Sequence, residues 1–155
     1  MNKSASYSIR RALSNESELL TEIAFKSKAY WGYDAEYMDK CQNDLIIHPE
    51  ELDEYIVNAL EVNQEAVGFY ELRGIIPEAN LFWLFLDPKA IGQGFGRTLW
   101  QHANQTAKDI GYKYLNIKSD PNAEGFYTEM GAVRIGELPS SAIPDLYFPL
   151  LRIYL

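Results

Sequence analysis

The chain has 155 residues, a length that fits one domain with a sizeable hydrophobic core. Hydrophobic residues make up 47% and charged residues 23%, so the composition suggests neither a disordered chain nor a membrane protein. The net charge of −8 argues against nucleic acid as a partner, because phosphate contacts need clustered lysine and arginine, and mildly favours cationic or neutral substrates. We therefore expect a single domain over residues 1–155 that binds neither nucleic acid nor membrane.

The first half of the sequence predicts a strand, two helices and a hairpin. The expected ranges are residues 7–11, 14–29, 34–38, 53–62 and 65–74. Asn15 can cap the first helix, and Glu18 stands three residues later, as a capping box requires. Gly32 allows a sharp turn after this helix, and Asp34 can cap the next one. His48 is expected in a polar loop between the second helix and the hairpin, as a turn residue rather than a catalyst.

The second half of the sequence alternates strands and helices. The expected ranges are strand 81–86, helix 94–110, strand 112–118, helix 121–130 and strands 133–136 and 147–155. A strand-helix-strand unit implies a parallel pair, whereas the hairpins before and after it are antiparallel. The sequence therefore predicts an α/β fold: a mixed, mostly antiparallel sheet of about seven strands flanked by helices. The final PLLRIYL segment could be an edge strand that pairs across a homodimer, or an internal strand.

Three alternating glycines follow the apolar strand, in the segment IGQGFG. Gly92, Gly94 and Gly96 remove Cβ atoms, allow positive φ and leave backbone N–H groups free at a helix start, with Arg97 nearby. This arrangement favours an anion site, and close strand-to-helix packing is the alternative. A Walker loop would need Gly-Lys-Ser/Thr, and a dinucleotide fingerprint would need a third glycine at Arg97, so neither motif fits.

The glycine turn resembles the Arg/Gln-x-x-Gly-x-Gly/Ala turn of the GNAT superfamily of N-acetyltransferases. Gly94 and Gly96 match its last two glycine positions, whereas Ile91 replaces the first Arg or Gln. The segment NAEGFYTEMGA, residues 122–132, independently resembles a second motif of that superfamily at its characteristic position. The resemblance covers essentially the whole chain. It implies a GNAT-like sheet in which the parallel strands 4 and 5 splay apart.

The resemblance implies acetyl-CoA as cosubstrate, no metal, and an acceptor that is a small-molecule amine or a protein or peptide amine. The pantetheine arm would bind along the backbone of strand 4, and the pyrophosphate would bind to the glycine turn. The implied cofactor-binding residues are Leu84, Phe85, Leu86, Ile91, Gly92, Gln93, Gly94, Phe95, Gly96, Arg97 and Asn122. A backbone amide near Leu84 would stabilise the carbonyl oxygen of the thioester.

Tyr127 matches the superfamily tyrosine that protonates the CoA thiolate, although it also fits a core position on a helix face. Glu71 is the first candidate for the general base, against the simpler expectation of a solvated surface carboxylate. Asp34, Glu36 or a water relay are alternatives. Four aromatic residues, each of which could equally be core, could wall the acceptor pocket: Trp31, Tyr33, Tyr70 and Trp83.

Two further expectations concern location and turnover. The single Cys41 cannot form an internal disulfide, and the N-terminal segment lacks the apolar core of a signal peptide, which predicts a cytoplasmic protein. Cys41 has no convincing histidine partner, so we do not expect a nucleophile there. Because Ile91 departs from the motif and the base is open, a non-catalytic acyl-CoA-binding sensor or interaction module with the same fold is the alternative to an enzyme.

Overall fold

The computed structural model describes residues 6–140 and 143–155, and within these residues the chain forms seven strands and five α-helices. The strands are β1 (Tyr7–Arg11), β2 (Ile56–Val62), β3 (Glu65–Ile75), β4 (Glu78–Leu86), β5 (Tyr114–Lys118), β6 (Val133–Pro139) and β7 (Tyr147–Tyr154). The helices are α1 (Ser17–Ala29), α2 (Ala35–Cys41), α3 (Pro49–Glu54), α4 (Phe95–Ile110) and α5 (Glu124–Glu129). This order follows the predicted one, with α3 added.

All seven strands belong to one sheet in the order β1-β2-β3-β4-β5-β7-β6. Among the strands of the described residues, only β4 and β5 pair in parallel, and every other neighbouring pair is antiparallel. The mixed, mostly antiparallel sheet predicted from the sequence is therefore confirmed. Among the described residues, no helix is long and apolar enough to cross a membrane.

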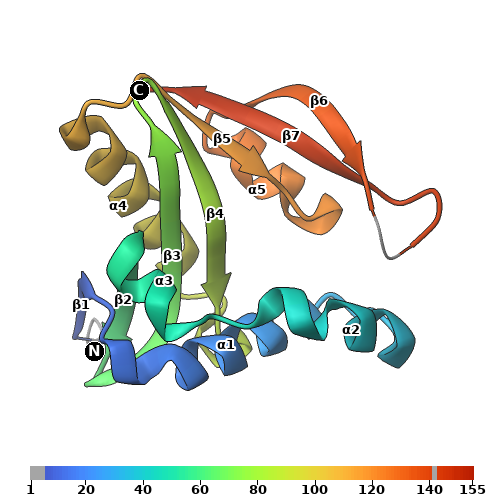
Figure 1. Cartoon of the computed structure of the whole chain (residues 1–155), viewed down its shortest axis with the longest axis horizontal. Coiled ribbons are helices and arrows are strands. Elements are labelled where there is room, and N and C mark those ends of the chain that lie inside the picture. The colour runs from blue at the N-terminus through green and yellow to red at the C-terminus, as the bar shows by residue number, and fades with distance from the viewer. Residues whose placement is uncertain (1–5, 141–142) are drawn as a thin grey trace.

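The two parallel strands separate about halfway along β4. Their pairing runs from Glu78 opposite Tyr114 to Leu81 opposite Ile117 and ends there, while β4 stays paired with β3 as far as Leu86. A register shift at the same level leaves Phe82 as an extra residue in β4. Figure 1 shows β4 and β5 diverging toward their C-terminal ends. The predicted splay is confirmed, and it leaves one edge of β4 without a strand partner.

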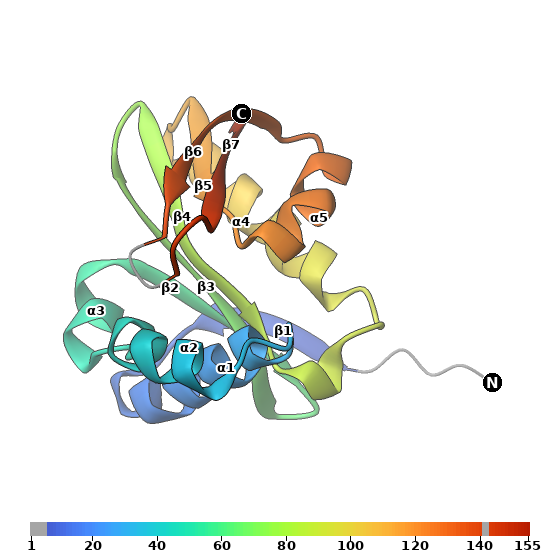
Figure 2. The same ribbon diagram turned by 90° about the vertical axis from the view of Figure 1, so that its right-hand side faces the viewer.

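Helices cover both faces of the sheet. α1, α2 and α3 lie on one face and α4 and α5 on the other (Figure 2). In α4, the buried Leu99, Ala103 and Ala107 recur every fourth residue, which gives the helix one apolar stripe against the sheet. Gly111 ends α4 at φ +112°, a left-handed conformation that glycine adopts without a Cβ penalty. The predicted extent of this helix is correct to within one residue.

The predicted capping box of the first helix is not formed. The Glu16 carboxylate accepts the Leu13 N–H at 2.8 Å and also binds Arg10, so residues 14–16 form a short 3-10 turn and α1 begins at Ser17. The salt bridge to β1 therefore decides where α1 begins. Asp34, in contrast, caps α2 as predicted, because its Oδ1 accepts the Tyr37 N–H at 2.8 Å.

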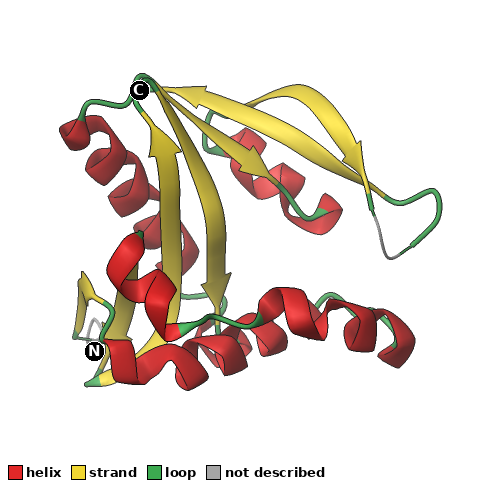
Figure 3. Cartoon of the chain, viewed as in Figure 1, coloured by secondary structure: helices red, strands yellow, loops and turns green. Residues whose placement is uncertain are grey.

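α3 is a further difference from the prediction, and the position of the last strand decides between the two alternatives left open. The segment expected as a loop forms α3 (Figure 3), because Pro49 suits a first helical turn and Leu52 is buried. β7 lies between β5 and β6 and is internal, so it cannot pair with a second copy as an edge strand. β1 and β6 are the two edges of the sheet instead.

Candidate active site

The glycine turn joins β4 to α4. Gly92 and Gly94 adopt φ values of +87° and +82°, and a Cβ built on either would meet no atom within 4 Å. A positive φ is also expected at Gly96, but this residue lies in the first turn of α4 and does not adopt one. The first N–H groups of an α-helix have no acceptor within the helix, and the helix dipole adds positive potential there. The turn thus presents backbone donors to open space beside the unpaired edge of β4.

The two sequence motifs pack directly against each other. A Cβ on Gly96 would lie 3.7 Å from the ring of Phe126, and the rings of Trp100 and Tyr127 meet edge-on with centroids 5.3 Å apart. Tyr127 belongs to the same core cluster as Leu84, on the unpaired stretch of β4. The fold therefore brings the glycine turn, the free edge of β4 and the candidate acid to one region.

Tyr127 lies on α5 and is almost completely buried. Burial raises the pKa of its hydroxyl well above the usual value, and the negative charge of Asp120 adds to the effect. The phenol therefore keeps its proton over the whole physiological pH range. A protonated phenol can donate that proton to a nearby base, which is the role predicted for Tyr127.

Glu71 is fully buried in β3, so the expectation of a solvated surface carboxylate is wrong. Its Oε2 accepts a hydrogen bond from Arg73 Nε at 2.5 Å, and Arg73 Nη2 lies 3.3 Å from Glu51 Oε2 on α3. The Arg73 guanidinium carbon lies over the rings of Tyr55 and Phe82, at 3.9 and 3.5 Å from their centroids. Residues Glu51, Glu71 and Arg73 are called the carboxylate cluster below.

Burial raises the pKa of Glu71 from 4.5 to about 7, while Arg73 opposes this rise and Glu51 adds to it. Its Oε1 is inaccessible and has no hydrogen-bond partner among the described residues. Trp83 lies opposite Glu71 in the sheet, at the level where β4 leaves β5. A buried carboxyl that is half ionised near neutral pH has the proton affinity that suits a general base.

The raised pKa of Glu71 predicts a specific dependence of stability on pH. Because the folded state holds this proton more tightly than the unfolded state, the unfolding free energy should fall as pH rises from about 4.5 to about 8. The unfolding free energy of the wild type should fall by about 3 kcal/mol more than that of Glu71→Gln over this pH range. Denaturant unfolding at a series of pH values measures the difference, and parallel curves for the two proteins would contradict it.

The predicted aromatic wall is only partly assembled. Tyr33 and Trp83 pack against the core on the face that α1 and α2 cover, and Trp31 is exposed at the end of α1. Tyr70 is fully buried on the opposite face, against α4, where its hydroxyl lies 2.8 Å from His102 Nδ1. Neighbouring strand residues point to opposite faces, so Tyr70 cannot share a pocket with Glu71.

A largely buried ion pair, not predicted from the sequence, joins α1 to the segment that follows β5. Lys28 Nζ lies 2.5 Å from Asp120 Oδ2, and both side chains are 12% exposed. The Tyr33 hydroxyl donates to Asp120 at 2.8 Å, and Asn122 Nδ2 donates to Asp120 at 2.9 Å. Burial alone would raise the pKa of Asp120, yet Lys28 and the other donors hold it below the usual value. This network links the α1–α2 turn to the cofactor-motif residue Asn122.

The other candidate residues lie outside this arrangement. The Asp34 side chain caps α2, and Glu36 forms an exposed pair with Lys40 at 3.6 Å. His48 is the residue before the first turn of α3, as expected of a turn residue. Cys41 is a half-buried free thiol at the end of α2. None of these four therefore lies in the carboxylate cluster or the glycine turn.

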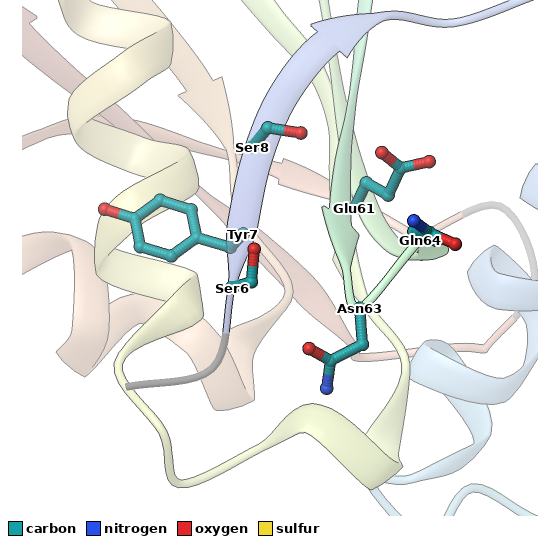
Figure 4. A pocket seen from close by; sticks show the side chains of 6 residues that line it. All are labelled: Ser6, Tyr7, Ser8, Glu61, Asn63 and Gln64. Atoms are coloured by element: carbon teal, nitrogen blue, oxygen red, sulfur yellow. The ribbon is translucent and has the colours of Figure 1, made fainter. Parts of the chain in front are cut away.

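A surface hollow on β1 and β2 lies apart from these residues (Figure 4). It encloses about 370 Å³ and is lined by Ser6, Tyr7, Ser8, Glu61, Asn63 and Gln64. Tyr7 turns its ring away from Glu61 and contacts Phe95, at a centroid distance of 5.9 Å. The hollow shares no residue with the predicted site. Among residues 6–140 and 143–155, no three His, Cys, Asp or Glu side chains gather as a metal site would require.

The fold and the glycine turn define a class of protein, and the comparisons with known proteins identify it. The profile of the family described as acetyltransferase (GNAT) domain matches residues 25–140, so the chain belongs to the GNAT acetyltransferase family. The predicted membership of the GNAT superfamily and the predicted acyltransferase activity are therefore confirmed at the level of the family. None of the curated proteins compared matches the sequence.

Solved structures of the same fold are similar over nearly the whole chain. A PaiA N-acetyltransferase from Thermoplasma acidophilum in complex with coenzyme A has a TM-score of 0.81 at 19% identity, over 97% of this chain and 99% of that one. A GCN5-related N-acetyltransferase from Rhodopseudomonas palustris has a TM-score of 0.82 at 18% identity, over 100% of this chain and 99% of that one. The ribosomal-protein-S18-alanine N-acetyltransferase from Escherichia coli has a TM-score of 0.69 at 18% identity, over 97% of this chain and 93% of that one. At these identities the likeness shows the fold.

Proposed function

We propose that the protein transfers the acetyl group of acetyl-CoA to a primary amine by direct attack, with residues 1–155 serving as one catalytic domain. The observation that carries this proposal is the unpaired edge of β4, which runs from the bulge at Phe82 to Leu86 and is followed, after a short 3-10 turn at Pro88–Ala90, by the glycine turn. An extended acyl-pantetheine arm would pair with that edge as a strand does, and its pyrophosphate would reach the turn. The solved relative from Thermoplasma acidophilum was crystallised with coenzyme A.

The cofactor would be held mainly by the main chain. Leu84 to Leu86 offer the backbone groups that β5 leaves unpaired, and residues 91–97 surround the start of α4. Because Ile91 cannot bond a phosphate through its side chain, the amides and Arg97 would supply the contacts. Both amide protons of Asn122 are engaged by Asp120 and Tyr33, so Asn122 would offer its amide oxygen to the pantetheine arm.

The reaction then needs three events at the thioester. The amine nitrogen bonds to the acetyl carbon while an amide near Leu84 stabilises the developing oxyanion. The carbon–sulfur bond breaks with its electron pair on sulfur, and the sulfur takes the Tyr127 proton, which water later replaces. The bound ammonium first loses one proton to water, and the neutral amine attacks. The second N–H proton, released as the amide forms, goes to Glu71, which passes it to water before the next cycle. These transfers balance, and they give the amide and CoA with its thiol restored.

The acceptor would approach from the face that carries Tyr33, Trp83 and the exposed Trp31. Aromatic faces attract an amine while it is still cationic, and the net charge of −8 has the matching sign. Tyr70 is left out of this site because it packs on the other face. Small-molecule and protein amines both fit this description.

Gly94→Ala tests the proposed cofactor site. The new methyl group would enter the open space at the start of α4, so CoA affinity should fall about 10-fold or more, as isothermal titration calorimetry would show. Gly111→Ala is the matched control, because Gly111 caps the other end of α4 with a similar positive φ. Both variants should lose about 1–2 kcal/mol of stability from backbone strain. Equal CoA affinities in the two variants would refute the site.

A further inference from the structure

Glu51 and Glu71 place two carboxyl groups on one guanidinium. Arg73 binds Glu71 through Nε at 2.5 Å and Glu51 through Nη2 at 3.3 Å. A single positive charge cannot neutralise two carboxylates, so the fully ionised cluster carries an excess negative charge. The side chains of Glu51 and Arg73 are only 18% and 24% exposed, and that of Glu71 is fully buried. Water therefore screens this excess charge poorly.

The surroundings of the cluster strengthen its internal coupling. The rings of Tyr55 and Phe82 both lie within 4 Å of the Arg73 guanidinium carbon, so cation–π contacts help to hold the guanidinium beside the two carboxyl groups. Opposite Glu71 in the sheet are Val57 on β2 and Trp83 on β4, which do not titrate near neutral pH. Among the described residues, the charged groups with the largest effect on the pKa of Glu71 are Arg73 from its own strand and Glu51 from α3.

We propose that Glu51 and Glu71 share one proton across Arg73, and that Glu51 thereby sets the pH range in which Glu71 accepts the proton of the acceptor amine. One added proton removes the excess negative charge, which explains why the buried arrangement is tolerated. Glu51 acts through Glu71 and is a positioning residue. This inference rests on the proposed function for its catalytic consequence, whereas the shared proton is a property of the unliganded protein.

The sharing predicts how Glu51→Gln acts. Removing the neighbouring negative charge should make Glu71 ionise at lower pH, so the acidic limb of the kcat/KM profile should move down by about one pH unit. Glu50→Gln is the matched control, since Glu50 is the exposed neighbour of Glu51 in the first turn of α3. Its profile should coincide with that of the wild type. A Glu51→Gln profile that also coincides would overturn the proposal.

A direct titration separates this inference from the proposed function. The carboxyl carbon resonances of glutamate, followed by NMR against pH, report Glu71 in the protein alone. The Glu71 midpoint should lie near 7 in the wild type and about one unit lower in Glu51→Gln. If that variant fails to fold, the wild type still decides, because a carboxyl that shares its proton with a second group titrates in two steps. A simple one-step curve for Glu71 would overturn the shared proton, whereas absent acetyl transfer would overturn the proposed function alone.

Discussion

Replacing Tyr127 by phenylalanine is expected to lower turnover by about 10²-fold or more while CoA affinity stays within about twofold of the wild type. The phenylalanine ring keeps the packing against Trp100 and Phe126, and only the hydroxyl that would protonate the thiolate is lost. Steady-state release of CoA thiol gives the turnover, and calorimetry gives the affinity. The pH at which wild-type activity is limited on the alkaline side should lie well above 7, because burial keeps the hydroxyl protonated.

Tyr112→Phe is the matched control for this prediction. Tyr112 is also a buried tyrosine of the same core cluster, and its hydroxyl donates to the Gly74 carbonyl at 2.9 Å, away from the proposed site. Its loss should cost about 1 kcal/mol of stability and leave turnover near the wild-type rate. Equal turnover in Tyr127→Phe and the wild type would contradict the assigned acid role.

Replacing Glu71 by glutamine is expected to lower turnover by about 10²–10⁴-fold and to remove the acidic limb of the pH profile near pH 7. Glutamine keeps the size of the side chain and can still accept a hydrogen bond from Arg73, but it cannot take a proton from the amine. The profile of kcat/KM between about pH 5 and 9 measures both effects.

Glu65→Gln provides the control on the same strand, because Glu65 forms an exposed pair with Lys89 at the start of β3. Its rate and its pH profile should match those of the wild type. Retention of the acidic limb in Glu71→Gln would show that another group, or a chain of water molecules, takes the proton.

The parts of the fold with strong local signals could be predicted from the sequence. α4 shows a four-residue apolar period and ends at Gly111, and residues 81–86 of β4 are apolar on both faces because helices cover both. α3 has only six residues and one buried apolar side chain, Leu52, so it offers no period to detect. The start of α1 depends on the pairing of Glu16 with Arg10, which is a tertiary contact.

The candidate site shows the same division. The glycine turn and Tyr127 carry motifs, and both fall where the predicted order of elements puts them. Glu71 is linked through Arg73 to Glu51 on α3, a helix that the sequence does not signal. Lys28 and Asp120 are 92 residues apart, so no local pattern indicates their ion pair. Tyr70 and Glu71, however, are consecutive residues of one strand, and the alternation of side chains along a strand would have been enough to predict that they point to opposite faces of the sheet.

Acceptor-dependent release of CoA tests the central proposal most directly. Wild-type protein is incubated with acetyl-CoA and a panel of polyamines, amino acids and peptides, and free thiol is followed with time. At least one amine should produce thiol together with an equal amount of acetylated product, and Tyr127→Phe should suppress both. Tight CoA binding with no thiol release above the amine-free rate for any acceptor class would contradict catalysis and favour an acyl-CoA sensor.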